Sequence, residues 1–97
     1  MKTYIILLNY TEQGIKKIKE SPKRLDAARK TAETMGVKLR DWYLVMGQYD
    51  ALVVAEAPND EAMSKVMLTI GALGNVRSQT LSAFTESEYR KLTADLP

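Results

Sequence analysis

Residues 4–8 (Tyr-Ile-Ile-Leu-Leu) form an unbroken apolar run near the start of the chain, and this run restricts the possible folds more than any other feature. Its aromatic and β-branched residues predict a strand over residues 2–10. Successive side chains of a strand point to opposite faces, so this strand is apolar on both of them. It therefore belongs inside a sheet that is covered on both sides.

The rest of the chain alternates between helix and strand patterns. Apolar residues at helical spacing predict helices over residues 21–35 and 60–70. Gly36 is expected to end the first helix, and Gly71 and Gly74 to end the second. Further strands are predicted over residues 37–46, 51–57 and 76–84.

Three helix starts carry capping signals. Ser21 is predicted to cap the first long helix, because a proline follows at the first helical position. Thr11 is predicted to cap a short helical turn, and residues 85–88 (Thr-Glu-Ser-Glu) form a capping box that begins a C-terminal helix.

These elements predict a single α+β domain over residues 1–97, with the order β-α-β-β-α-β and a helical tail. This is the ferredoxin-like arrangement, in which the crossovers are right-handed. Its sheet has the strand order 4-1-3-2, and all neighbouring strands are antiparallel.

The two long helices of this fold cover one face of the sheet, yet the second and third strands are also apolar on both faces. Only the strand over residues 76–84 is mixed. An exposed apolar face of this size marks an interface, so we predict self-association through the sheet, as a two-fold dimer or a higher oligomer. The alternative is that the C-terminal helix folds back over the open face.

The predicted topology brings three polar segments to one end of the sheet. These are the end of the first strand, the turn at residues 47–50 and the start of the fourth strand. Convergent polar groups beside an apolar interior are typical of a ligand site. The candidate ligand-binding residues are Asn9, Tyr10, Tyr49, Asp50, Asn75 and Arg77.

Structural roles for these residues stay open as alternatives. Asp50 is suited to accept hydrogen bonds from backbone donors in the hairpin, where Asp and Gly are favoured. Asp50 and Arg77 are also suited to form an ion pair, because the strands that carry them lie about 10 Å apart.

Composition excludes several classes of chemistry. The chain has no cysteine and no histidine, so disulfides, thiolate nucleophiles and imidazole bases are absent; we expect no metal site and no cofactor. Residues 16–30 are rich in Lys and Arg but contain no aromatic residue to stack on a base, so we do not expect nucleic-acid binding. No leader or membrane-length apolar segment is seen, and we expect a cytoplasmic protein without a membrane partner.

The order and spacing of several short motifs resemble those of the GYD-domain family, small prokaryotic proteins named for a Gly-Tyr-Asp signature. The likeness covers nearly the whole chain. It is carried by residues 11–15, 21–22, 42–43, 46–50, 56–61, 74–77 and 83–85, with the signature itself at Gly47-Gln48-Tyr49-Asp50.

The resemblance implies a fold of the dimeric α/β-barrel type, in which two ferredoxin-like sheets pack face to face. It implies no particular reaction and no catalytic residue. Related folds include cofactor-independent oxygenases, small-molecule sensing domains and dehydratase-like enzymes, and the fold alone does not choose between them.

Three functional hypotheses follow. The first is a homo-oligomeric module that binds a small anionic or aromatic molecule near Tyr10, Asp50 and Arg77. The second is a cofactor-independent enzyme, oxygenase-like, acting on a small phenolic or anionic substrate with Asp50 as proton acceptor. The third is an assembly element whose polar cluster only joins strand ends.

Overall fold

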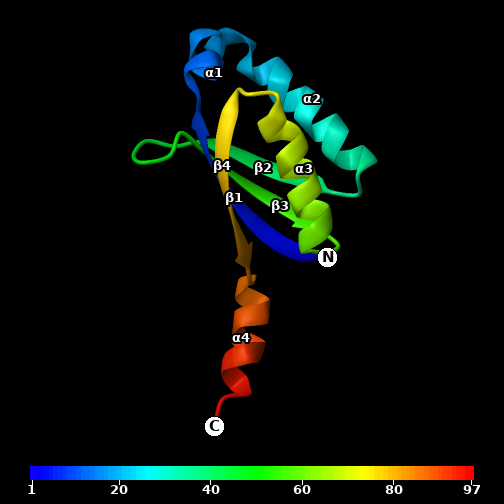
Figure 1. Ribbon diagram of the computed structural model, residues 1–97. Coiled ribbons are helices and arrows are strands. Elements are labelled where there is room, and N and C mark those ends of the chain that lie inside the picture. The colour runs from blue at the N-terminus through cyan, green and yellow to red at the C-terminus, as the bar shows by residue number, and fades with distance from the viewer.

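The computed structural model describes all residues from 1 to 97 and has an α+β fold with a projecting C-terminal helix (Figure 1). Four strands and two long helices follow in the order predicted from the sequence. The elements are β1 (Lys2–Tyr10), α1 (Glu12–Lys16), the 3-10 turn η1 (Ile18–Glu20), α2 (Ser21–Thr34), β2 (Lys38–Leu44), β3 (Ala51–Ala57), α3 (Asp60–Ala72), β4 (Val76–Ala83) and α4 (Glu86–Ala94).

The four strands form one antiparallel sheet in the order β2-β3-β1-β4, which is the predicted order read in reverse. β1 lies in the interior, with β3 paired along one side and β4 along the other. The ferredoxin-like fold predicted from the pattern of strands and helices is confirmed.

Both long helices pack on the same face of the sheet, which we call the covered face (Figure 1). Every other residue of β3 is buried there, and so are Tyr4 and Ile6 of β1. Met63 and Val66 of α3 complete the core from the helical side. The opposite face, which we call the open face, carries Ile5, Leu7, Leu52, Val54 and Leu81.

Two of the three predicted caps are confirmed. The Thr11 hydroxyl accepts a hydrogen bond from the Gly14 amide, and Thr85 and Glu88 form the capping box of α4. The prediction for Ser21 is wrong, because η1 runs directly into α2 and gives Ser21 a helical backbone (φ −54°, ψ −42°). The Ser21 hydroxyl is therefore directed to another partner, described below.

The alternative in which the C-terminal helix folds back over the open face is also wrong. Only Phe84 and Thr85 separate β4 from α4, so α4 continues away from the end of the sheet (Figure 1). Every residue of α4 is exposed. None of the helices has the length and apolar character needed to span a membrane.

Candidate ligand-binding site

A cavity of about 90 Å³ lies between the covered face of the sheet and the helices α2 and α3. It is at the end of the sheet where β1 finishes. Twelve of its fifteen lining residues are hydrophobic, and they come from all four strands and both long helices. One wall is formed by Ala28, whose small side chain leaves space between α2 and the sheet.

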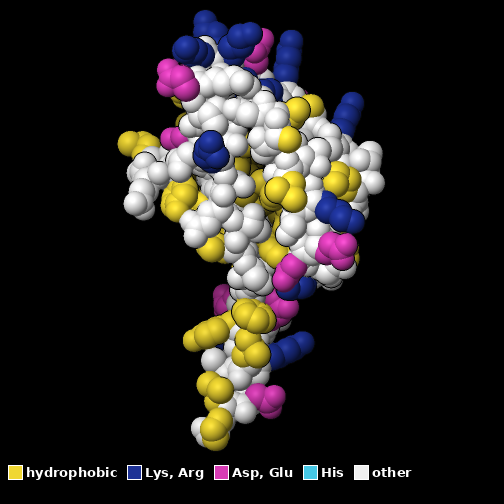
Figure 2. Space-filling model, in the orientation of Figure 1, with side chains coloured by type: hydrophobic (Ala, Val, Ile, Leu, Met, Phe, Trp, Pro, Cys, Tyr) yellow, Lys and Arg dark blue, Asp and Glu magenta, His cyan; other side chains and the backbone are white.

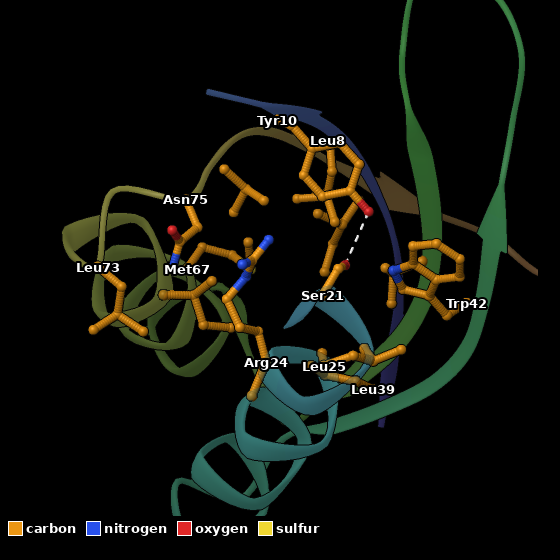
Figure 3. A pocket seen from close by; sticks show the side chains of 15 residues that line it. Leu8, Tyr10, Ser21, Arg24, Leu25, Leu39, Trp42, Met67, Leu73 and Asn75 are labelled. Carbon is orange, nitrogen blue, oxygen red and sulfur yellow. Dashed lines mark hydrogen bonds between the residues drawn. The ribbon is translucent and has the colours of Figure 1, made fainter. Parts of the chain in front are cut away.

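The polar wall of the cavity is built from α2 and the end of β1. The hydroxyls of Tyr10 and Ser21 are 3.1 Å apart and hydrogen-bonded (Figure 3). Because Ser21 lies in the first turn of α2, this bond joins the helix to the last residue of β1. The two hydroxyls thus present one hydrogen-bonding position inside an otherwise apolar space.

The guanidinium of Arg24 lies between Asn75 and the Tyr10–Ser21 pair (Figure 3). It donates hydrogen bonds to two backbone carbonyls, those of Lys17 at 3.1 Å and Gly14 at 3.0 Å. Arg24 forms no ion pair with any carboxylate, and no Asp or Glu lines the cavity. The cavity therefore carries an unneutralised positive charge at its polar wall.

The loop between α3 and β4 closes the cavity and is held by α1. The Asn75 side-chain oxygen accepts a hydrogen bond from Gln13 at 3.0 Å, and the Asn75 carbonyl accepts one from the Thr11 amide at 3.1 Å. The Thr11 hydroxyl donates to the Gly74 carbonyl at 2.6 Å. These bonds fix Asn75 at the edge of the cavity.

Asp50 has a backbone-supporting role at the same end of the sheet. Its carboxylate accepts a hydrogen bond from the Tyr10 amide at 2.9 Å, and its own amide donates to the Leu8 carbonyl at 2.8 Å. These contacts attach the loop between β2 and β3 to the end of β1. They position Tyr10, and they occupy one of the two Asp50 oxygens.

The other predicted site residues gather on the open face. Asn9 and Arg77 are directly opposite in the β1–β4 register, and the Tyr49 hydroxyl donates a 2.6 Å hydrogen bond to Gln79, the neighbour of Leu7. Arg77 forms no ion pair with Asp50, so that alternative is wrong. Asp50 instead accepts a hydrogen bond from the Tyr10 amide at the end of β1, while Arg77 lies opposite Asn9 on β4.

The model of the GYD domain matches residues 4–93. The chain belongs to the GYD-domain family.

A relative of this GYD-domain chain is the "Glutamine synthetase and cystathionine beta-lyase binding protein" of Thermus thermophilus. It is 31% identical over 84 residues, which are 86% of this chain and 88% of the relative.

Two solved structures are similar in fold. The crystal structure of MtbAldR has a TM-score of 0.69 at 17% identity; the match covers 88% of this chain and 52% of MtbAldR, so the chain spans about half of that protein. The crystal structure of TTHA0845 from Thermus thermophilus has a TM-score of 0.57 at 23% identity. The match covers 88% of this chain and 95% of TTHA0845.

Sequence reasoning missed Ser21 and Arg24 as cavity residues in this GYD-domain chain. The sequence predicts Ser21 as a cap, and Arg24 is one of the many Lys and Arg residues in the segment 16–30. The signal was present, because residues 21, 24, 25 and 28 follow the i, i+3, i+4, i+7 spacing of one helix face and all line the cavity. Extending the apolar stripe of α2 by one turn would have included them.

A second polar cluster stands at the opposite end of the covered face. Asp60, the first residue of α3, accepts hydrogen bonds from Lys2 at 2.7 Å and from the Tyr4 hydroxyl at 2.5 Å. The hydrogen bond from Lys2 lowers the pKa of Asp60, while burial and then the bond to Asp60 raise the pKa of Tyr4. The cluster ties the start of α3 to β1.

Proposed function

We propose that this GYD-domain protein is a homo-oligomeric module that binds a small molecule in the cavity between α2, α3 and the sheet. The observation that carries the proposal is an apolar cavity whose polar wall holds Arg24 without a carboxylate partner. Ligand pockets are typically apolar spaces with a few convergent polar groups. Tyr10 and Asn75, both predicted from the sequence, line this space.

The lining favours a compact aromatic or branched aliphatic acid as the ligand. The volume of about 90 Å³, against about 150 Å³ for a cavity that binds benzene, limits the apolar body to a single ring or a short branched chain. A carboxylate on that body would pair with Arg24, and charge-assisted hydrogen bonds of this kind are stronger than neutral ones. The Tyr10 and Ser21 hydroxyls add one further hydrogen-bonding position.

Binding fits this cavity better than the enzymatic alternative does. A general base must lie within hydrogen-bonding reach of the reacting group, yet no carboxylate lines the cavity. Asp50, the predicted proton acceptor, supports the Tyr10 amide instead. The residues of the cavity therefore favour recognition over proton transfer.

The self-association in this proposal is based on the open face of the sheet. Its apolar residues suit burial against the same face of a second copy, in a two-fold dimer or a larger assembly. In such an assembly the polar corner formed by Asn9, Tyr49 and Arg77 would lie beside the interface as a second ligand contact. Arg77→Ala is expected to lower ligand retention and to leave the oligomer intact; loss of the oligomer would assign Arg77 to assembly.

Benzoate tests the cavity with a matched pair of variants. At a concentration 100 times its dissociation constant, benzoate should raise the free energy of unfolding of the wild-type chain by about 2.7 kcal/mol. Ala28→Leu fills the cavity and should abolish this stabilisation, whereas Ala27→Leu, on the exposed side of the same helix, should retain it. Thermal melts with and without benzoate measure the difference.

Arg24→Gln separates charge recognition from apolar binding. This variant should lose the response to benzoate and keep a response to benzyl alcohol, which has a similar body without the charge. Equal stabilisation of wild type and Ala28→Leu by benzoate would overturn the proposed cavity site. Native mass spectrometry of the purified chain adds the mass of any molecule that is retained.

A second candidate function is docking onto a larger enzyme, and the name of the Thermus thermophilus relative favours it. The relative is matched along nearly its whole length, so the comparison concerns the complete module. Co-elution with purified glutamine synthetase or cystathionine β-lyase in size-exclusion chromatography tests this candidate. Elution as separate peaks at micromolar concentrations would contradict it.

A further inference from the structure

Three exposed apolar surfaces lie outside the cavity. The first is the tip of the hairpin, where β2 ends at Leu44 and the β2–β3 loop (residues 45–50) follows; Met46 of this loop is 99% exposed. The second is the open face of the sheet, and the third is the projecting helix α4. None of these surfaces is covered within the chain.

α4 needs a partner for physical reasons. Tyr89 and Leu92 stand three residues apart on α4 and form an exposed apolar stripe, with Phe84 before the helix and Leu96 after it. A helix of nine residues is marginal in water by itself, even with a capping box and the ion pair between Arg90 and Glu86. Packing of the stripe against another surface would stabilise it.

The three surfaces face the same side of the molecule. In Figure 1 the β2–β3 loop projects to the left, away from α2 and α3 and beyond the open face. Figure 2 shows hydrophobic side chains gathered on this left side of the loop and of α4, while most charged side chains of α4 lie on the right. The loop and α4 thus border the open face above and below.

The register places these two projections at diagonally opposite corners of the sheet. Leu44 lies at one end of the edge strand β2, in the row of Ala51 and Leu8. Ala83, which leads into α4, lies at the other end of the opposite edge strand β4, in the row of Thr3. Consider two copies whose open faces pack against each other, with a two-fold axis between the sheets along the other diagonal. This axis places the loop corner of each copy next to the α4 corner of its partner.

We propose that the β2–β3 loop and α4 form a reciprocal clasp between two copies of this chain. The proposal rests on the self-association put forward above and specifies its geometry. Met46 of one copy packs against the Tyr89–Leu92 stripe of the other, and the two-fold repeats the contact. The open faces pack between the two clasps, with strands that cross at a steep angle, as in orthogonal sheet packing.

The apolar content of these surfaces favours a second copy as the occupant. A stable interface buries roughly 800 Å² on each partner. The exposed parts of Tyr43, Phe84 and Tyr89 contribute to that area, because large aromatic side chains bury much surface at interfaces. The aliphatic residues of the open face add to it. A clasp also explains why the loop and α4, far apart in the sequence, both expose apolar side chains on the same side.

Because the chain contains no cysteine, a disulfide can report the clasp directly. The double variant Met46→Cys/Leu92→Cys should form a covalent dimer on mild oxidation, seen by intact mass and reversed by reductant. The matched control Met46→Cys/Leu68→Cys places the second thiol on α3, where Leu68 is 74% exposed, and should form no more covalent dimer than the single variants.

A second pair of variants measures the contribution of α4. Tyr89→Ser/Leu92→Ser should raise the dimer dissociation constant about 100-fold or more, because each dimer loses two buried leucines and two aromatic residues. Leu68→Ser should leave this constant unchanged. Analytical ultracentrifugation over a concentration series measures both.

The outcomes separate the clasp from the self-association on which it rests. A dimer in native mass spectrometry that neither cross-links through positions 46 and 92 nor weakens on substitution of the α4 stripe would overturn the clasp alone. A wild-type chain that stays monomeric at micromolar concentrations would overturn the self-association itself. A monomer that captures glutamine synthetase through an intact α4 stripe would assign α4 to a different protein partner.

Discussion

The covered and open faces of the sheet are built from the same strands and from similar residues, yet they differ sharply in burial. In β1, Ile6 is 1% exposed on the covered face, whereas its neighbour Ile5 on the open face is only half-buried. Hydrophobicity is the same for both positions. The difference comes from α2 and α3, which pack on one face only (Figure 1).

This contrast shows that an apolar strand face is stabilised by burial, but its sequence does not decide which element or molecule buries it. On the covered face α2 and α3 bury the apolar side chains, except at the cavity beside Tyr10. On the open face no helix of the chain covers the apolar side chains (Figure 1). The cavity and the open face are both apolar surfaces that the fold leaves uncovered.

The sharpest test of the contrast compares Ile6→Ala with Ile5→Ala. Ile6→Ala should lower the free energy of unfolding by about 3 kcal/mol, since it leaves a hole in a closed core. Ile5→Ala should lower it by less than about 1.5 kcal/mol for the monomer, because a half-buried side chain has less transfer free energy to lose. Urea denaturation at several protein concentrations measures both.

The two faces also differ in how the loss of stability in each variant depends on protein concentration. The effect of Ile5→Ala should grow with protein concentration as the dimer of the wild type becomes populated, while that of Ile6→Ala is present at the lowest concentration. Equal losses for both variants in the monomer would remove the distinction between the faces.

A smaller effect is expected where the covered side is most tightly packed. A Cβ on Gly14 would lie 2.0 Å from the Asn75 carbonyl oxygen, so Gly14→Ala must displace the α3–β4 loop and should destabilise the protein by about 1–3 kcal/mol. It should also weaken benzoate binding, because Asn75 lines the cavity.

Gly71→Ala is the matched control for this substitution. Gly71 lies within α3 with nothing near its added Cβ, so the change should stabilise the helix by about 0.5–1 kcal/mol. Thermal melts of the two variants should therefore shift in opposite directions. An unchanged melting temperature for Gly14→Ala would show that the α3–β4 loop can move away from the added methyl group at little cost.

The smallest expected effect concerns pH and the Lys2–Tyr4–Asp60 cluster. The hydrogen bond from Lys2 lowers the pKa of Asp60 below its ordinary value of 3.8, so its contribution to stability is present above that pH and is lost as the pH falls through the folded-state pKa. The pKa values of Lys2 and Tyr4 are raised, so their contributions are lost as the pH rises above 10 through the folded-state values.

Asp60→Asn tests the predicted loss of stability at low pH. The difference in melting temperature between wild type and Asp60→Asn should be present at pH 6 and should shrink toward pH 2. Glu61→Gln removes a charge from the same first turn of α3 without touching Lys2, and it should give a smaller difference. An unchanged difference at all pH values would show that the ion pair is not responsible.

Much of the fold could be predicted from the sequence because its signals are local. The period of two in Ala51–Ala57 and the helical spacing of Met63 and Val66 depend on neighbours along the chain, and the structure bears out both elements. Ser21 was assigned wrongly because the 3-10 turn before it has no distinct sequence pattern. Its backbone conformation follows from the continuous path of η1 into α2.

The candidate site was only partly accessible to the same reasoning. The topology brings Tyr10, Asp50 and Asn75 to one end of the sheet, as predicted, and hydrogen bonds join Asp50 to Tyr10 and Asn75 to α1. Arg77 was placed near Asp50 because strand order gives distance across the sheet. Strand order does not give the hydrogen-bond partner of each side chain, and Asp50 binds the Tyr10 amide instead.

By itself, the sequence determined the strands, the helices, their antiparallel order and the surplus of apolar surface on the sheet. Only the tertiary structure decided which face the helices cover, where the cavity remains and that α4 projects away from the domain. The physical reason is that alternation along a strand divides its residues into two sets, and only the docking of α2 and α3 tells which set is buried.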